Sequence, residues 1–241
     1  MAMYYNGKKV RNLYYNGKCI TRLALGKEMT RLVEGDDFVR AEWLVGDGTA
    51  YIDTLHNLNE DLEIQTKCVL PTYGTYLFWY REVTTYQTMA VWNIITFDSG
   101  RLRFANSSTA ARLTAEQSNT YEFNTYDSTL QINGVLYTVT KNPINRDFYL
   151  FQAELEERSM PEVRSDYTTN AVRCAYFRFI NANGTTIQDL TPCRLLRPIP
   201  ATLDANGIAR NADECGMYNS VNGLFYGNVA SSGGTFTVSD N

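Results

Sequence analysis

The sequence predicts an all-β chain, in which a small N-terminal β-hairpin repeat precedes a β-sandwich of the jelly-roll type. Three observations support this fold class. A short phrase occurs three times within the first 32 residues, twice with an Asn-Gly turn. The chain holds 17 Tyr and 11 Phe, and Thr, Val and Ile recur in short runs, a composition that favours strands. From residue 35 onward, about a dozen short apolar segments are separated by turn signals, as in sandwiches and jelly rolls.

The repeat predicts a separate arm at the N-terminus. Residues 4–13 read YYNGKKVRNL, residues 14–23 read YYNGKCITRL, and residues 25–32 read LGKEMTRL, a shortened third copy. Asn-Gly favours a tight hairpin turn, and hairpins this small are stable only when they pack on something else. We therefore expect residues 1–35 to anchor or oligomerise the chain and residues 36–241 to form the jelly-roll domain. The alternative is an irregular N-terminal sheet of the main domain.

Apolar and aromatic side chains that recur in the repeat are the expected contacts for anchoring and assembly. These residues are Tyr4, Tyr5, Val10, Leu13, Tyr14, Tyr15, Ile20, Leu23 and Leu32.

The charge distribution supports the same division. Residues 1–34 hold seven basic and two acidic residues, a net charge of +5. Because the whole chain has 22 basic and 26 acidic residues, the remainder carries −9. A basic arm on an acidic body indicates a docking surface. Nucleic acid is not the expected partner, because aromatic and aliphatic residues alternate with the arm's charges, which suits packing.

Targeting signals and cysteine usage are consistent with cytosolic synthesis. No stretch approaches the roughly 20 apolar residues of a membrane span, and no apolar segment follows the first basic residues. The five cysteines form no CxxC pair, and with a single histidine, His56, they do not predict a zinc site. Cys174 and Cys193 lie symmetrically about the turn at 182–184 and could face each other, although cytosolic synthesis favours free thiols.

The body reads as strands in order along the chain. Leu130–Tyr137, interrupted by Asn133-Gly134, is the clearest hairpin. Thr109–Gln117 is the one segment expected to be helical. The other expected strands are Ala41–Leu44, Tyr51–Thr54, Leu62–Leu70, Tyr76–Val83, Met89–Phe97, Arg101–Ala105, Thr120–Asn124, Phe148–Glu154, Val172–Ile180, Thr185–Leu190, Tyr218–Val221, Leu224–Tyr226 and Thr235–Val238.

Several phrases of the body occur in an order that resembles the concanavalin A-like (laminin G-like) jelly roll, in a version found in tailed phages and prophages of gut bacteria. The resemblance covers about residues 41–238, and YYNGKKV-type starts resemble N-terminal segments of such phage proteins. The matching residues are Gly48, Tyr51, Ile52, Asp53 and Thr54, then Gly184, Thr185, Asp189, Leu190 and Pro192, then Gly216, Met217, Tyr218, Gly223, Phe225, Tyr226 and Asn228.

Catalysis and metal binding are not expected. Glu154 and Glu156 would share a strand face like a glycosidase pair, but the run continues into a charged loop and lacks the rest of a hydrolase motif. His56 has no nucleophile-elbow phrase to accompany it. Two oxygen-rich groups lack the fixed spacing of a calcium loop and are expected to form turns. They are Asn57, Asn59, Glu60 and Asp61, and then Asp204, Asn206, Asn211 and Asp213.

Carbohydrate recognition has better support. Aromatic faces and planar polar groups, the side-chain types that hold sugars, gather in the segment 76–93. Alternation along a strand leaves only about half of them facing away from the core. The expected ligand-binding residues are Arg81, Tyr86 and Trp92.

These observations and the resemblance together lead to one functional expectation. The chain is expected to be a non-enzymatic structural protein of a tailed-phage virion, a fibre or decoration protein of head or tail, that displays a lectin-like jelly roll. Other virion proteins, further copies of the chain (most simply a trimer) and surface polysaccharide are the expected partners, with no cofactor, membrane or nucleic acid. The alternatives are a bacterial or prophage carbohydrate-binding module and, with less support, a glycoside hydrolase.

Overall fold

The structure, a computed structural model, divides by its internal contacts into two units, Met1–Thr30 and Arg31–Asn241. The described backbone covers residues 3–5, 8–10, 13–15, 18–20, 31–57, 61–71, 75–85, 88–96, 101–104, 107–112, 117–124, 129–138, 147–155, 171–231 and 233–240. The described side chains are those of residues 31–57, 61–71, 75, 77–78, 117–124, 129–138, 147–152, 171–231 and 233–240.

The first unit contains two antiparallel hairpins with the same register. β1 (Met3–Tyr5) pairs with β2 (Lys8–Val10), and β3 (Leu13–Tyr15) pairs with β4 (Lys18–Ile20). Met3 lies opposite Val10, and Leu13 lies opposite Ile20 at the equivalent position. The first two copies of the repeat therefore form the same backbone structure twice. Most of the third copy falls on residues 21–30, outside the described residues.

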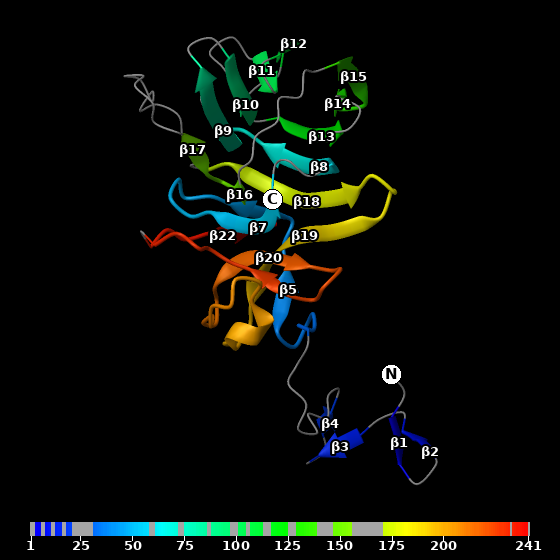
Figure 1. The fold of residues 1–241 in the computed structure, drawn as a ribbon. Helices are drawn as coiled ribbons and strands as arrows, with labels where there is room; N and C mark the ends of the chain where they lie inside the picture. The colour runs from blue at the N-terminus through cyan, green and yellow to red at the C-terminus, as the bar shows by residue number, and fades with distance from the viewer. Residues whose placement is uncertain are drawn as a thin grey trace. The chain divides into compact units, whose positions relative to one another are not determined.

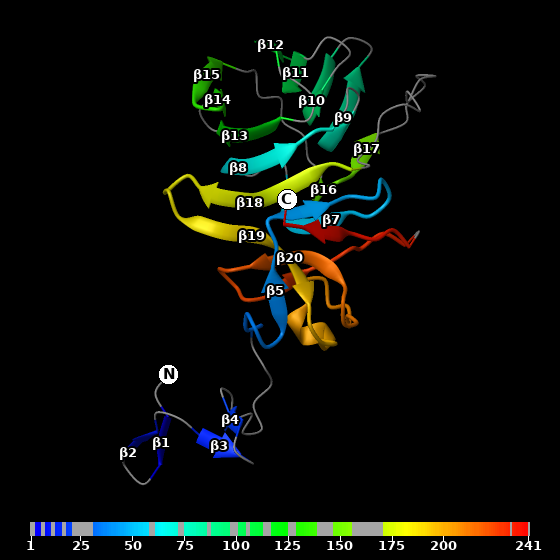
Figure 2. The ribbon, with the colours of Figure 1, turned by 180° about the vertical axis from the view of Figure 1, so that it is seen from behind.

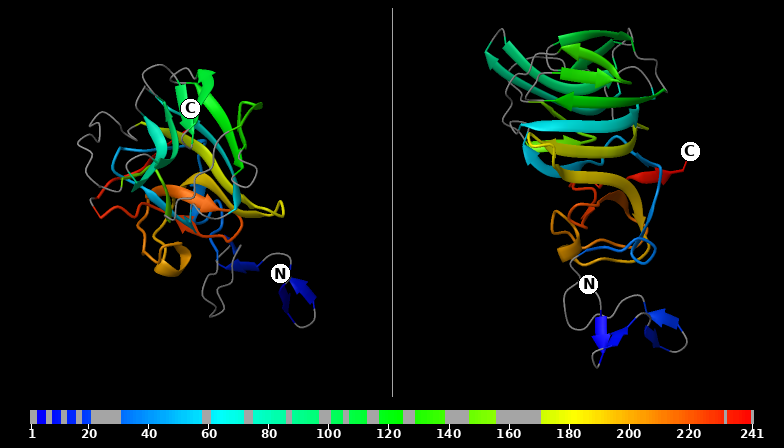
Figure 3. Two further views of the ribbon diagram at one scale, coloured as in Figure 1. Left: turned by 45° about the horizontal axis from the view of Figure 1, so that its top comes forward. Right: turned by 90° about the vertical axis from the view of Figure 1, so that its right-hand side faces the viewer.

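The second unit is built on a large sheet whose neighbouring strands pair antiparallel (Figure 1). Along its main path the strands are β15 (Val135–Thr138), β14 (Thr129–Ile132), β13 (Ser118–Asn124), β8 (Leu62–Val69), β18 (Arg173–Asn181), β19 (Thr186–Leu195), β20 (Cys215–Asn219) and β21 (Phe225–Tyr226). β5 (Phe38–Arg40), β6 (Trp43–Val45) and β22 (Thr237–Ser239) pair at its side. In Figure 3, right, these strands lie one above another from green β14 and β15 through cyan β8 to yellow β18 and β19.

A second layer faces this sheet. β7 (Ile52–Asn57) pairs with β16 (Asp147–Leu150), and β17 (Ala153–Leu155), which follows two residues later, pairs with β9 (Tyr76–Thr85). β10 (Thr88–Thr96), β11 (Arg101–Phe104) and β12 (Ser107–Arg112) extend β9 in that order (Figure 2). Along the chain, β7, β9 and β16 alternate with β8, β13 and β18 of the large sheet. This crossing between layers is the connectivity of a jelly roll.

Aromatic rings join the two layers in the core. Phe148 and Phe78 come from the second layer, and Phe177 and Phe179 come from the large sheet; all four are at most 1% exposed. The centroid of the Phe148 ring lies 4.8 Å from that of Phe78, 5.5 Å from that of Phe177 and 5.6 Å from that of Phe179. Inward residues of β8 and β13 complete this core by alternation. The predicted all-β jelly-roll sandwich is confirmed.

A register shift in β18 explains why its alternation is irregular. Cys174 and Phe177 both point into the core although they are three residues apart, and the pairing of β18 with β8 shifts between Cys174 and Tyr176. Such a bulge adds one residue and reverses the faces beyond it. Near this point β18 and β19 take different partners: Cys174 of β18 pairs with Leu44 of β6, and Cys193 of β19 pairs with Arg40 of β5. Cys174 and Cys193 are both buried free thiols.

Two expected elements differ from the structure. The helical expectation for Thr109–Gln117 is wrong where it can be compared, because Ser107–Arg112 forms β12. Small and polar residues with weak local preference pair there with β11, so tertiary pairing overrides the local pattern. The expected strand Phe148–Glu154 is split into β16 and β17 at Phe151, whose positive φ of 63° turns the chain. Within the described part of the chain, no helix has the length and apolar character needed to cross a membrane.

Candidate functional site

Residues 47–51, near the start of the second unit, meet two segments near its C-terminus, residues 228–230 and 234–235. We call the hydrogen bonds between the side chains of Asp47 and Asn228 and the backbone of residues 49–51, 230 and 234–235 the C-terminal latch. Val229 N–H donates to the Tyr51 carbonyl at 3.0 Å beside it. The latch joins the segment before β7 to the loop after β21 and to the segment before β22.

Asp47 is a hydrogen-bond acceptor for both segments that it joins. Its Oδ1 accepts from the backbone N–H groups of Thr49 and Ala50, both at 2.8 Å. Its Oδ2 accepts from the backbone N–H of Thr235 at 2.5 Å. Burial alone would raise the pKa of Asp47, but these hydrogen bonds lower it to about 2. The carboxylate therefore stays charged, and closes its own turn while it holds the chain before β22.

Asn228 supplies the remaining contacts of the latch. Its Oδ1 accepts from the backbone N–H groups of Tyr51 at 3.1 Å and Ala230 at 2.8 Å. Its Nδ2 donates to the Gly234 carbonyl at 2.6 Å. One primary amide thus satisfies three backbone groups that belong to no strand ladder. A side chain with both donor and acceptor functions is required there.

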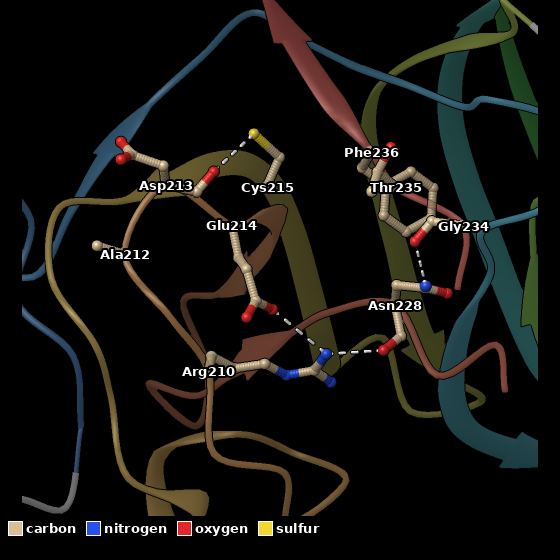
Figure 4. Close-up of a pocket in the computed structure, with 9 residues that line it drawn as sticks. All are labelled: Arg210, Ala212, Asp213, Glu214, Cys215, Asn228, Gly234, Thr235 and Phe236. Atoms are coloured by element: carbon tan, nitrogen blue, oxygen red, sulfur yellow. Dashed lines mark hydrogen bonds and ion pairs between the residues drawn. The ribbon is translucent and has the colours of Figure 1, made fainter. Parts of the chain in front are cut away.

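A pocket of about 390 Å³ lies beside the latch (Figure 4). It is bordered by the loop before β20 on one side and by the latch segments on the other. Its lining residues are Arg210, Ala212, Asp213, Glu214, Cys215, Asn228, Gly234, Thr235 and Phe236.

A buried ion pair forms part of the pocket wall. Arg210 Nε donates to Asp204 Oδ2 at 2.8 Å, and the two side chains are only 5% and 0% exposed. Arg210 Nη1 donates to the Asn228 carbonyl at 2.7 Å and lies 3.6 Å from Glu214 Oε2, as Figure 4 shows. Glu214 in turn accepts from the backbone N–H of Asn211 at 2.7 Å. Most polar groups of this wall are therefore engaged with one another, whereas the buried Arg210 Nη2 has no hydrogen-bond partner among the described residues.

The chemistry of the pocket fits structural stabilisation. Burial raises the pKa of the Cys215 thiol, an effect that Arg194 only partly offsets, so the reactive thiolate is disfavoured. None of the described residues that line the pocket is a histidine. No group of three or more His, Cys, Asp or Glu suited to a metal ion occurs among the residues that the structure describes.

The residues expected to bind a ligand are located only by their backbone. In the register of β9 with β10, Arg81 lies opposite Val91, and Trp92 lies opposite Tyr80. The side chains of Arg81 and Trp92, and the whole of Tyr86, lie outside the described residues. Their binding role stays a prediction.

The residues expected to anchor the chain divide between the two units. The side chains of Tyr4, Tyr5, Val10, Leu13, Tyr14, Tyr15 and Ile20, and the whole of Leu23, lie outside the described residues. Leu32 lies in the second unit, where it is 1% exposed, and its N–H donates to the Gly223 carbonyl at 2.8 Å. The structure thus places Leu32 in the body, whereas we expected it in the arm.

Other residues weighed from the sequence have structural contacts. The ring centroids of His56 and Phe179 are 4.6 Å apart. Asp204 Oδ1 accepts from the N–H of Asn206 at 2.9 Å, so this part of the second oxygen-rich group forms a turn. The side chain of Glu154 and the whole of Glu156 lie outside the described residues, as do Asn59 and Glu60.

Sequence reasoning did not identify the wall of the pocket. A usable signal was present, because Arg210 is the one basic residue between Asp204 and Glu214, four residues before the latter. A lone basic residue among acidic ones in a loop that is otherwise rich in turn formers is a candidate for a buried pair.

Comparison with known proteins adds little to these observations. No protein-family model matches the chain, and no curated protein matches it. Among solved structures, the chain is similar to domains LG4-5 of the mouse laminin alpha1 chain, with 13% sequence identity and a TM-score of 0.41. The similarity covers 83% of this chain and 52% of the laminin chain, so this chain spans about half of its length. The fold assignment rests on the strand pairing described above.

Proposed function

We propose that the chain is a non-enzymatic attachment protein of a tailed-phage virion. Its N-terminal arm anchors it to other virion proteins and assembles it as a homo-oligomer, most simply a trimer. Its jelly-roll body is displayed outward, as part of a fibre or decoration, and adheres to surface polysaccharide. The protein is made in the host cytoplasm and released with the virion.

The repeated hairpin is the observation that carries this proposal. Two hairpins of three residues per strand have the same register and belong to a unit distinct from the body. Isolated two-stranded hairpins of this size are marginal in water, so they need a further surface to pack against. Repetition of the same unit supports packing on copies of itself or on a repetitive partner.

The body supports a display role. Jelly rolls serve as viral capsid domains and as lectin domains. The pocket at the C-terminal latch does not favour turnover, because Arg210 is paired with Asp204 and Glu214 and burial disfavours the Cys215 thiolate. These features are compatible with a stable, passive module.

The solution mass of two chains tests the proposal. Light scattering on the full chain and on a chain that begins at Arg31, which retains the buried Leu32, is expected to give a trimer and a monomer, respectively. A full chain with Val10→Asp and Ile20→Asp should also be monomeric. The two residues occupy equivalent positions of the two hairpins, and a charge at each would oppose the apolar packing that assembly requires. A monomeric full chain would contradict assembly by the arm and favour the alternative, a monomeric carbohydrate-binding module.

A further inference from the structure

The outer face of the large sheet carries a straight row of polar side chains. Residues directly opposite one another on adjacent strands share a face of the sheet. Gln131 lies opposite Glu122, Glu122 opposite Gln65, Gln65 opposite Arg178, and Arg178 opposite Asp189. We call these five residues the polar row. It crosses five strands, a length of about 19 Å at the usual strand spacing of about 4.8 Å.

The polar row faces away from the core. Its neighbours along the strands, Ile64, Phe123 and Phe177, are at most 4% exposed, whereas all five members of the row are at least partly exposed. The side chain of Arg178 is 37% exposed and that of Asp189 is 22% exposed. Ligand atoms can therefore reach side chains whose backbones are fixed in the middle of a sheet.

Hydrogen bonds hold the row in a defined arrangement. Arg178 Nη1 donates to Gln65 Oε1 at 3.3 Å, and Arg178 Nε donates to Asp189 Oδ1 at 3.2 Å. Gln65 Nε2 donates to Glu63 Oε1 at 2.6 Å, and Ser220 Oγ donates to Asp189 Oδ2 at 3.2 Å. Side chains fixed in this way lose little conformational entropy when a ligand binds.

An aromatic ring lies beside the row. Tyr176, two residues before Arg178 on β18, is partly exposed and lies opposite Lys67 of β8. The Arg178 guanidinium carbon is 5.8 Å from the centroid of the Tyr176 ring. The row thus combines planar polar groups with an adjacent ring that offers an apolar surface.

The chemistry of the row favours a neutral, hydroxyl-rich ligand. The positive charge of Arg178 is balanced by the negative charge of Asp189, and Glu122 adds a further negative charge. The row therefore has no surplus positive charge that would attract phosphates. Two of the five members, Glu122 and Asp189, are acidic, and acidic residues are depleted in the cores of protein interfaces. Amide, carboxylate and guanidinium groups in a line provide both donors and acceptors.

We infer that an extended polysaccharide segment binds across the polar row, with Arg178 and Gln65 at its centre. The inference rests on the proposed adhesive function and assigns that function to the outer face of the large sheet. This face is distinct from the pocket at the C-terminal latch, which lies at the start of β20.

Binding of the full chain to immobilised neutral bacterial polysaccharides and to mucin O-glycans freed of sialic acid and sulfate tests the inference. Arg178→Ala and Gln131→Ala should each weaken binding, Arg178→Ala by about tenfold, as expected for a lost charge-assisted hydrogen bond. Gln131 lies at the end of the row, so its variant probes the face with little risk to the fold. Arg194→Ala is the matched control, because Arg194 is exposed on β19, lies 3.6 Å from the exposed Asp213, and is not in the row.

Each outcome is decisive. Weaker binding by both row variants, with unchanged binding by Arg194→Ala and unchanged melting temperatures, supports the row as the glycan site. Glycan binding that both row variants retain overturns the row but leaves adhesion standing. No binding of the wild-type chain to any probe overturns the adhesive function and the row together. Equal binding to mucin stripped of its glycans would indicate a protein ligand and also overturn the inference.

Discussion

Asn228 offers a direct test of whether the C-terminal latch stabilises the body. Asn228→Ala removes the acceptor for the Tyr51 and Ala230 N–H groups, at 3.1 and 2.8 Å, and the donor to the Gly234 carbonyl, at 2.6 Å. No apolar packing of comparable size is lost, because only a short amide is removed. The substitution therefore measures the hydrogen bonds almost alone.

The expected magnitude follows from the three contacts. A hydrogen bond contributes about 1 kcal/mol to stability, so three contribute about 3 kcal/mol. Asn228 is only partly buried, so water can replace some of the lost partners. We expect the free energy of unfolding to fall by about 2–3 kcal/mol and the melting temperature to fall by about 5–10 °C for a body of this size.

Urea unfolding of three full-length variants separates the contributions. Asn228→Asp keeps the acceptor but places a carboxylate oxygen against the Gly234 carbonyl, so it should destabilise the body at least as much as Asn228→Ala. Asn183→Ala is the control, because Asn183 is exposed in the turn between β18 and β19, and should change stability by less than about 0.5 kcal/mol. An Asn228→Ala stability within that range of wild type would refute the latch.

Three further predictions concern neighbouring features. Arg210→Met should cost about 3–5 kcal/mol, because it leaves the fully buried Asp204 carboxylate without its cation, and urea unfolding measures this loss. Gly216→Ala should lower the free energy of unfolding by about 1–3 kcal/mol in the same assay, because the added Cβ would lie 2.5 Å from the Tyr226 carbonyl oxygen. A Gly216→Ala variant as stable as wild type would contradict this geometry. The pKa of Asp47, about 2 in the folded chain, lies below its ordinary 3.8, so its contribution is complete above pH 3.8 and is lost as the pH falls toward 2. Asp47 is largely exposed, so Asp47→Asn should remove less than about 1 kcal/mol at pH 5, and its difference from wild type should vanish near pH 2 in acid-unfolding curves.

The local sequence pattern predicted where the strands of the body lie better than it predicted which strands pair with one another. The expected strand Leu62–Leu70 corresponds to β8, and the Asn-Gly hairpin at residues 130–137 has the positive φ values, 51° at Asn133 and 80° at Gly134, that its turn type requires. These features depend on alternation and on turn residues a few positions apart. The pairing of β8 with β18 joins residues more than 100 positions apart, and no local pattern specifies it.

The candidate binding residues were hard to predict for the same reason, because strand pairing brings them together. Gln65 and Arg178 look like ordinary outward residues of two separate strands, and only the register of β8 with β18 makes them neighbours. Asp204 and Arg210 are close in sequence, yet their burial depends on the loop that packs over Phe225, whose ring centroid lies 5.9 Å from the Arg210 guanidinium carbon. The sequence predicted Arg81, Tyr86 and Trp92 in segment 76–93 instead, because a local concentration of aromatic and planar polar residues can be recognised without knowing which strands pair.

The residues that carry the sequence resemblance belong largely to the architecture of the fold. Asn228 closes the latch, Gly223 has a positive φ of 79° in a turn, and Gly216 leaves no room for a Cβ. Each is required by backbone geometry, so each would be needed whatever the body binds. The polar row lies on strands whose outward positions the fold leaves free to vary. If ligand choice resides there, proteins that share the structural phrases can bind different glycans, and the row, rather than the phrases, is the part of the sequence to compare when specificity is asked.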